Sequence, residues 1–244
     1  MQKKMGQIRL YISQPLAQNQ NVQLGEEQSH YLKNVMKLQV GDTFLCFDGQ
    51  NGEFSAQLAE IGKKQSRITI QQQTRSFQAV PDIWLLFAPV KKDNTDFILQ
   101  KATELGVRKI IPILTRYTIS EKIKKERYIA QTIEASEQCR RTDVPEISDI
   151  AKFSDLWHTW DKNRKLYFMD ETLNGLPVAQ VFQKASVPCA ILVGPEGGFS
   201  PEELKMLREL SFAQGVKLGN RILRAETAVV AALSCWQALS GDWQ

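Results

Sequence analysis

The sequence predicts an α/β protein in which a small β-rich domain precedes a larger domain with a mostly parallel sheet. Short strand patterns fill the chain as far as residue 73, and strands alternate with helices from Asp82 onward. Such alternation is typical of βαβ units, whose strands run parallel. A polar stretch, 71–78, separates the two patterns and ends at Val80-Pro81. We therefore expect two domains, 1–74 and 78–244.

The first domain is expected to be a small barrel, because several short strands follow one another closely in it. In the first strand, Ile8, Leu10 and Ile12 alternate with larger polar or amphipathic side chains. The later strands are separated by glycine-containing turns and are expected at 43–48, 53–60 and 66–73. One helix, at about 26–37, interrupts them, and its apolar face consists of Leu32, Val35 and Met36.

The second domain alternates buried strand patterns with amphipathic or apolar helices. The strands are expected at 83–89, 107–114, 166–169, 189–194 and 216–218. The helices are expected at 95–105, 124–139, 201–210 and 225–239. The last helix is apolar on nearly all sides, which is typical of a helix buried in a domain core or at a subunit contact.

Composition excludes several classes of protein. The net charge of +4 is mildly basic, so it is compatible with a polyanionic partner without identifying one. Four scattered cysteines and two histidines form no zinc-binding pattern, and they indicate reduced thiols. The sequence shows no apolar run that would span a bilayer and no signal-peptide core. We expect a soluble, cytoplasmic protein that uses no metal.

Two glycine-containing loops near the C-terminus indicate a ligand site. Each follows an apolar strand and precedes a helix, where open α/β sheets bind their ligands. The first is Gly194-Pro195-Glu196-Gly197-Gly198, whose glycines let the backbone approach a ligand closely. A plain strand-to-helix turn remains the alternative, although it would need fewer glycines. Neither loop is a P-loop, a dinucleotide fingerprint or a nucleophile elbow.

Charged side chains accompany the second loop and the first strand. Arg221, Arg224 and Glu226 lie among apolar neighbours, where charges need partners or a function. An ordinary Arg224–Glu226 capping pair explains them equally well. Arg9 and Tyr11 share one face of the first strand and could hold a phosphate and stack a base, although ordinary surface positions fit as well.

Taken together, these segments resemble the bacterial 16S ribosomal RNA uridine N3-methyltransferases, the RsmE family of the SPOUT class. No single motif identifies the family, but the order and number of the matches are specific. The matching segments are Arg9-Leu10-Tyr11, 30–37, 40–49, 100–107, 134–145, 194–200 and 218–228. Three places depart from the pattern: Lys37 stands where arginine is common, Arg140 stands where glycine often does, and 91–96 is less basic than the family's usual stretch there.

The resemblance implies a PUA-like RNA-binding barrel followed by a SPOUT α/β domain with a C-terminal trefoil knot. It implies a homodimer that transfers a methyl group from S-adenosylmethionine to N3 of a uridine near the 3′ end, in the decoding region, of 16S ribosomal RNA in the small subunit. The cofactor would bind mainly to backbone groups in the knot loops. The residues implied are Met169, Glu171, Val193, Gly194, Gly198, Leu218, Gly219, Ile222, Leu223 and Thr227.

Uridine N3 carries a proton, so methylation there needs a base and a group that stabilises the developing anion. We expect Arg224 to hold the uracil oxygens or a nearby phosphate, and Glu226 to orient Arg224 or to accept the proton. RNA contacts are expected from Arg9, Tyr11 and Arg141.

Two other functions remain open on the sequence alone. Another SPOUT activity, such as ribose 2′-O-methylation or transfer RNA methylation, would use similar cofactor loops. A non-catalytic RNA-binding or ribosome-assembly factor would bind the cofactor without transferring its methyl group. A nucleotide-binding oxidoreductase is least favoured, because the dinucleotide fingerprint is missing.

Overall fold

The computed structural model describes residues 8–62, 64–119 and 123–244, which divide into two compact units. Unit 1 comprises Met1–Ala79 together with Ser136–Val144, and unit 2 comprises Val80–Ala135 and Pro145–Gln244. The first seven residues of the expected domain 1–74 lie outside the described residues. The segment Ser136–Val144, expected in the second domain, groups with unit 1 instead.

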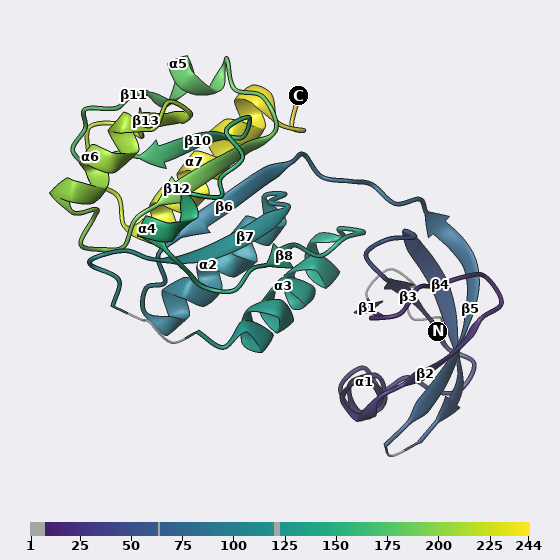
Figure 1. Ribbon diagram of the computed structural model, residues 1–244. Helices are drawn as coiled ribbons and strands as arrows, with labels where there is room; N and C mark the ends of the chain where they lie inside the picture. The colour runs from purple at the N-terminus through teal and green to yellow at the C-terminus, as the bar shows by residue number, and fades with distance from the viewer. Residues whose placement is uncertain (1–7, 63, 120–122) are drawn as a thin grey trace. The chain divides into compact units, whose positions relative to one another are not determined.

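Unit 1 is built on a five-stranded sheet (Figure 1). Its strands are β1 (Arg9–Tyr11), β2 (Asn21–Leu24), β3 (Thr43–Phe47), β4 (Glu53–Ile61) and β5 (Ser66–Arg75). Their order is β1-β3-β4-β5-β2; the β1–β3 pair is parallel and the others are antiparallel. The four expected strands are confirmed, whereas the short strand β2 was not predicted.

The expected helix at 26–37 is wrong in its second half. An α-helix, α1 (Glu26–His30), continues into a π-helical turn, η1 (Tyr31–Val35), in which the N–H of Met36 donates to the carbonyl of Tyr31 at 2.9 Å. The i→i+5 pattern rotates the side chains away from the 3.6-residue period. Leu32 is therefore buried as expected, but Val35 is 57% exposed.

Arg9 explains why Ser136–Val144 belongs to unit 1. Its guanidinium donates to the carbonyls of Ser136 at 2.8 Å, Glu137 at 3.1 Å and Arg141 at 2.8 Å. Nε donates to Glu53 at 2.6 Å. Arg9 is only 6% exposed, so the strand face expected to meet solvent or RNA is covered by this segment.

Arg140 has a backbone conformation that favours the glycine common at this position of the resembling family. It follows α3 (Lys125–Cys139) with a φ of 64°, in the left-handed region that favours glycine after a helix. A glycine at this position of the resembling family would adopt this conformation without a steric cost.

Unit 2 contains an eight-stranded sheet, and every strand pair in it is parallel (Figure 1). The strands are β6 (Ile83–Phe87), β7 (Lys109–Leu114), β8 (Glu146–Ile147), β9 (Ala151–Lys152), β10 (Lys165–Met169), β11 (Leu176–Pro177), β12 (Cys189–Val193) and β13 (Ala213–Lys217). The order is β11-β13-β10-β12-β6-β7-β8, and β9 pairs with the end of β7. The expected parallel sheet is confirmed.

Helices cover both faces of this sheet. Besides α3 they are α2 (Lys92–Glu104), α4 (Phe153–Leu156), α5 (Val178–Phe182), α6 (Pro201–Glu209) and α7 (Ala225–Ser240). Alternate residues of β6 and β12 pack into a core with α2, α5 and α7, and the residues between them pack into a second core with α4 and α6. Strands buried on both faces read as continuous apolar runs, which is why the sequence revealed them.

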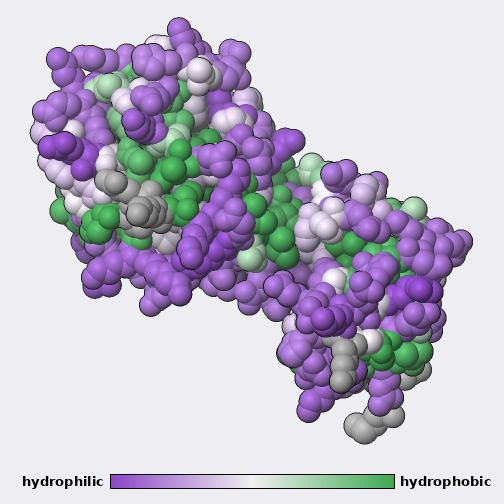
Figure 2. Space-filling model, turned by 60° about the horizontal axis from the view of Figure 1, so that its bottom comes forward, coloured by the Kyte–Doolittle hydropathy of each residue, from purple (hydrophilic) through white to green (hydrophobic). Residues whose placement is uncertain are grey.

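Helix α7 forms part of the first core. Four of its side chains are fully buried there: Val229, Ala232, Leu233 and Trp236. This confirms burial in the domain core, one of the two positions that the sequence predicted for this helix. Most of the surface in Figure 2 is hydrophilic, with hydrophobic residues gathered in a few patches.

Candidate functional site

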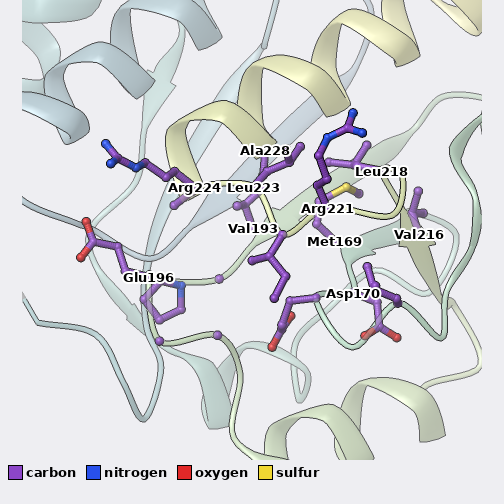
Figure 3. Close-up of a pocket in the computed structure, with 18 residues that line it drawn as sticks. Met169, Asp170, Val193, Glu196, Val216, Leu218, Arg221, Leu223, Arg224 and Ala228 are labelled. Atoms are coloured by element: carbon purple, nitrogen blue, oxygen red, sulfur yellow. The ribbon is translucent and has the colours of Figure 1, made fainter.

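Three loops of unit 2 enclose a cavity beyond the carboxyl edge of its sheet (Figure 3). They follow β10, β12 and β13, which are neighbours in the order β13-β10-β12. Parallel neighbours end at the same edge, so three separate segments of the chain meet there. The cavity has a volume of about 410 Å³.

The buried part of the cavity lining is mostly apolar, with Asp170 as a buried carboxylate, and three of its exposed residues are charged. Its buried apolar side chains are Met169, Val193, Val216, Ala225 and Ala228. Its exposed charged side chains are Glu196, Arg221 and Arg224. A mostly apolar concavity with few polar groups is the usual form of a small-molecule site.

Most residues expected to bind a cofactor line this cavity. They are Met169, Glu171, Val193, Gly194, Gly198, Leu218, Ile222 and Leu223. Gly219 and Thr227 are not part of the lining. Asp170 and Arg221, which lie within the expected cofactor loops, also line the cavity, whereas Leu173 and Val216 were not expected there. Cofactor binding by the expected residues stays a prediction.

Glu171 joins two of the loops. Its Oε1 accepts the N–H of Phe199 at 2.7 Å, linking the loop after β10 to the loop after β12. Gly198 lies against the same carboxylate with a φ of 71°, and an added Cβ would come within 2.5 Å of Oε1. Glycine is needed here for the packing of one loop on the other, and not only for the approach of a ligand.

Gly198→Ala is therefore expected to destabilise unit 2. Gly41→Ala is the matched control, because Gly41 also has a positive φ, 94°, but an added Cβ would meet nothing within 4 Å. Crowding at Gly198 should lower the free energy of unfolding by about 1–3 kcal/mol more than the control change does. Denaturant unfolding measures both; equal losses would contradict the proposed contact.

Burial raises the pKa of Glu171 above its ordinary value, and the Phe199 N–H opposes that rise in part. The folded state therefore favours the neutral acid. The raised pKa of Glu171 therefore contributes to the stability of the folded state below the ordinary pKa, and this contribution is lost as the pH rises through the raised pKa. Glu171→Gln keeps an acceptor for Phe199 without the charge, so its melting temperature relative to wild type should increase from about pH 4 to pH 7. A constant difference between the two proteins would contradict this.

Arg224 and Glu226 occupy different environments. Arg224 is the N-cap residue of α7 and lines the cavity. In Figure 3 its side chain and that of Glu196 both point to the left of the view. Glu226 lies in the first turn of α7 but does not line the cavity, and its Oε2 is buried without a hydrogen-bond partner. The alternative of an Arg224–Glu226 pair is not found among the described residues.

The expected RNA-binding residues are largely enclosed within unit 1. Arg9 is buried as described above. Arg141 donates to both carboxylate oxygens of Asp143, at 3.0 and 2.8 Å, and its side chain is 8% exposed. Tyr11 packs edge-on against Phe47, and burial raises its pKa. The pairing and burial of the two arginines argue against a direct contact with phosphate; RNA contact by Tyr11 stays a prediction.

Within the part of the chain that the structure describes, His, Cys, Asp and Glu side chains form no group of three or more that could hold a metal ion. No helix over those same residues is long and apolar enough to cross a membrane.

Comparison with known proteins identifies the family. The RNA methyltransferase domain family matches residues 78–237, and the RNA methyltransferase PUA domain family matches residues 24–71. Ribosomal RNA small subunit methyltransferase E of Rickettsia conorii is 33% identical over 93% of each chain. This chain belongs to the ribosomal RNA small subunit methyltransferase E family. The expected family and its PUA-like N-terminal domain are thereby confirmed.

Two solved structures resemble this member of the methyltransferase E family over nearly its whole length. The putative methyltransferase Lpg2936 of Legionella pneumophila, in complex with S-adenosylmethionine, is 30% identical with a TM-score of 0.86, covering 96% of this chain and 98% of that one. The methyltransferase E of Neisseria gonorrhoeae, bound to S-adenosylmethionine, is 29% identical with a TM-score of 0.86, covering 97% and 99%.

Proposed function

We propose that this protein transfers a methyl group from S-adenosylmethionine to ribosomal RNA of the small subunit. The observation that carries the proposal is the cavity formed by the loops after β10, β12 and β13, in a chain whose structural relatives were solved with S-adenosylmethionine. Its volume lies within the range of about 300–1,000 Å³ that is usual for small-molecule sites.

The residues of the cavity fit this cofactor. Met169, Val193 and Val216 offer an apolar surface for an adenine ring. The carboxylates of Asp170 and Glu171 lie in the same lining, where negative charge complements the sulfonium and ammonium cations of the cofactor. When bound, S-adenosylmethionine supplies an electrophilic methyl group.

The target we propose is N3 of a uridine in the decoding region near the 3′ end of 16S ribosomal RNA. Arg224 supports this target because it lines the cavity and its guanidinium makes no hydrogen bond or ion pair with any described residue. It would hold the uracil oxygens as negative charge develops on the ring. Glu226 has a buried Oε2 with no hydrogen-bond partner and makes no hydrogen bond or ion pair with Arg224 among the described residues, so its expected role in orienting Arg224 stays a prediction.

We further propose that the C-terminal segment forms a trefoil knot. β13 lies between β10 and β11, which are consecutive strands, so the loop that joins β10 to β11 has to cross the end of β13. The chain leaving β13 passes that same loop at the cavity. Tracing the backbone of a crystal structure with its two ends extended outward would test the knot.

We also propose a homodimer that acts in the cytoplasm during ribosome biogenesis. Helix α7 keeps a half-buried apolar face, with Val230, Ala231 and Cys235, outside the fully buried set of the core. A second copy packed there would bury it. Light scattering in solution should give twice the mass of one chain, and a monomer at micromolar concentration would contradict the dimer.

The deciding experiment for the activity uses labelled S-adenosylmethionine and small ribosomal subunits that lack the modification, followed by nucleoside analysis. Label in 3-methyluridine supports the cofactor, substrate and reaction together. Label in another nucleoside would keep the methyltransferase and overturn the target. Cofactor binding with no label in any RNA would overturn catalysis and favour a non-catalytic RNA-binding role.

A further inference from the structure

Among the acidic residues that line the cavity, Glu196 is distinguished by its lack of partners. Asp170 accepts hydrogen bonds from Thr172 and Arg208, and Glu171 accepts one from Phe199. Glu196 is exposed, lines the cavity and makes no hydrogen bond or ion pair with any described residue. Its carboxylate is therefore available to a ligand that enters from solvent.

An aromatic ring lies beside the loop that carries Glu196. Tyr117 follows β7, and its Cβ would lie 3.1 Å from a Cβ added to Gly197. The side chain is 46% exposed, so part of the ring faces solvent next to the cavity loop. An exposed tyrosine packed on a glycine offers a flat apolar surface.

The turn that carries Tyr117 is held in place. The hydroxyl of Thr118 accepts the N–H of Thr115 at 2.8 Å, which closes the turn. The N–H of Arg116 donates to Glu203 at 2.8 Å, in the first turn of α6. The ring is thus presented by a turn tied to the element that follows the Glu196 loop, and it needs little ordering when a ligand arrives.

An unpaired uracil needs three kinds of contact, and this edge of the sheet supplies all three. Single-stranded bases stack on aromatic side chains and are read by hydrogen bonds at their edges. Tyr117 offers the stacking surface, Glu196 an acceptor for the N3–H group, and Arg224 donors for the ring oxygens. They follow three different strands, β7, β12 and β13.

We propose that Tyr117 and Glu196 form the subsite for the target base, with Tyr117 stacking on the ring and Glu196 accepting its N3 proton. The inference rests on the proposed function. N3 gives its proton to a Glu196 oxygen and its electron pair to the new bond with the methyl carbon, while the carbon–sulfur bond breaks toward sulfur. Glu226 does not line the cavity, so Glu196 replaces it as the proton acceptor.

Tyr117→Ala tests the stacking contact. Stacking of a base on an aromatic side chain is worth about 1–3 kcal/mol, so the KM for small-subunit RNA should rise about 5- to 150-fold. The dissociation constant for S-adenosylmethionine should change less than twofold, and Tyr117→Phe should recover most of the lost RNA affinity. Phe97→Ala removes another half-exposed ring, on α2, and controls for general effects of the change.

Glu196→Gln tests the proton transfer. Loss of a general base should lower kcat about 100-fold or more. Without the base only uridine that has already lost its proton reacts, so kcat of the variant should rise about tenfold per pH unit near neutrality, more steeply than in wild type. Glu209→Gln, an exposed glutamate of α6 paired with Lys205 at 4.0 Å, is the matched control.

The outcomes separate this inference from the proposed function. No methyl transfer by the wild-type protein would overturn the function itself. An active wild type with Tyr117→Ala and Glu196→Gln within twofold of it would overturn the base subsite alone. Loss of S-adenosylmethionine binding in Glu196→Gln would assign Glu196 to the cofactor site and overturn its role as proton acceptor.

Discussion

Replacing Arg224 by alanine is expected to lower methyl transfer about 100-fold or more, because removal of one donor aimed at developing charge typically costs that much. Arg224 lines the cavity and its guanidinium is not paired with any described side chain, so its loss leaves no buried charge behind. Single-turnover rates with saturating RNA measure the effect. The affinity for S-adenosylmethionine, followed by calorimetry, should change less than about threefold.

Two further variants sharpen this test. Arg224→Lys keeps the charge but loses the planar set of donors, so it should restore only part of the rate if two uracil oxygens are held together. Arg67→Ala removes an exposed arginine of unit 1 and controls for the change in net charge. Full turnover and full RNA affinity in Arg224→Ala would show that the assignment is wrong.

Replacing Arg9 by alanine is expected to destabilise unit 1 by about 3–5 kcal/mol, the usual cost of breaking a buried ion pair from one side. Arg9 and Glu53 have side chains only 4% and 5% exposed, and Arg9 also stacks 4.4 Å from the centre of the Phe47 ring. Its removal leaves Glu53 without its nearest cation and three carbonyls without their donor. Thermal and denaturant unfolding measure the loss.

The exposed pair Arg67–Glu60 provides the matched control, with side chains 54% and 62% exposed at 3.0 Å. Arg67→Ala should cost about 0–1 kcal/mol. If Arg9→Ala instead left unfolding unchanged and weakened RNA binding, the original expectation of an RNA contact would be restored and the structural role would be wrong.

The sequence predicts the longer elements of unit 2, because strands covered on both faces give continuous apolar runs and helices give a 3.6-residue period. The short elements β8, β9, β11, α4 and α5 were not predicted, because two to five residues are too few to show either pattern. β12 and α6 end within one residue of their expected positions. β13 begins three residues earlier than expected, since Ala213-Gln214-Gly215 has little strand propensity of its own and is held by pairing with β10. The π-helical turn in unit 1 could not be predicted either, because its i→i+5 spacing does not follow the 3.6-residue period.

Two of the three cavity loops, those after β12 and β13, could be found because glycine and charged residues follow apolar strands there. Tyr117 could not be found in this way, because its place beside Gly197 depends on the order of strands in the sheet. The shared face of Arg9 and Tyr11 follows from the two-residue period of a strand. The segment that covers that face cannot be predicted in this way, because Ser136 lies 127 residues further along the chain than Arg9.

The position of Ser136–Val144 bears on how such a protein can be divided or recombined. Unit 1 is completed by a stretch encoded far downstream of its sheet, between two parts of unit 2. A fragment ending at residue 79 would lack the carbonyls that Arg9 binds, and a fragment starting at residue 80 would carry them without Arg9. Two related genes that exchanged only their first halves would encode mismatched partners at this contact. Unit 1 is thus not a module that can be moved on its own, and substitutions near Arg9 depend on the residues present beyond residue 135.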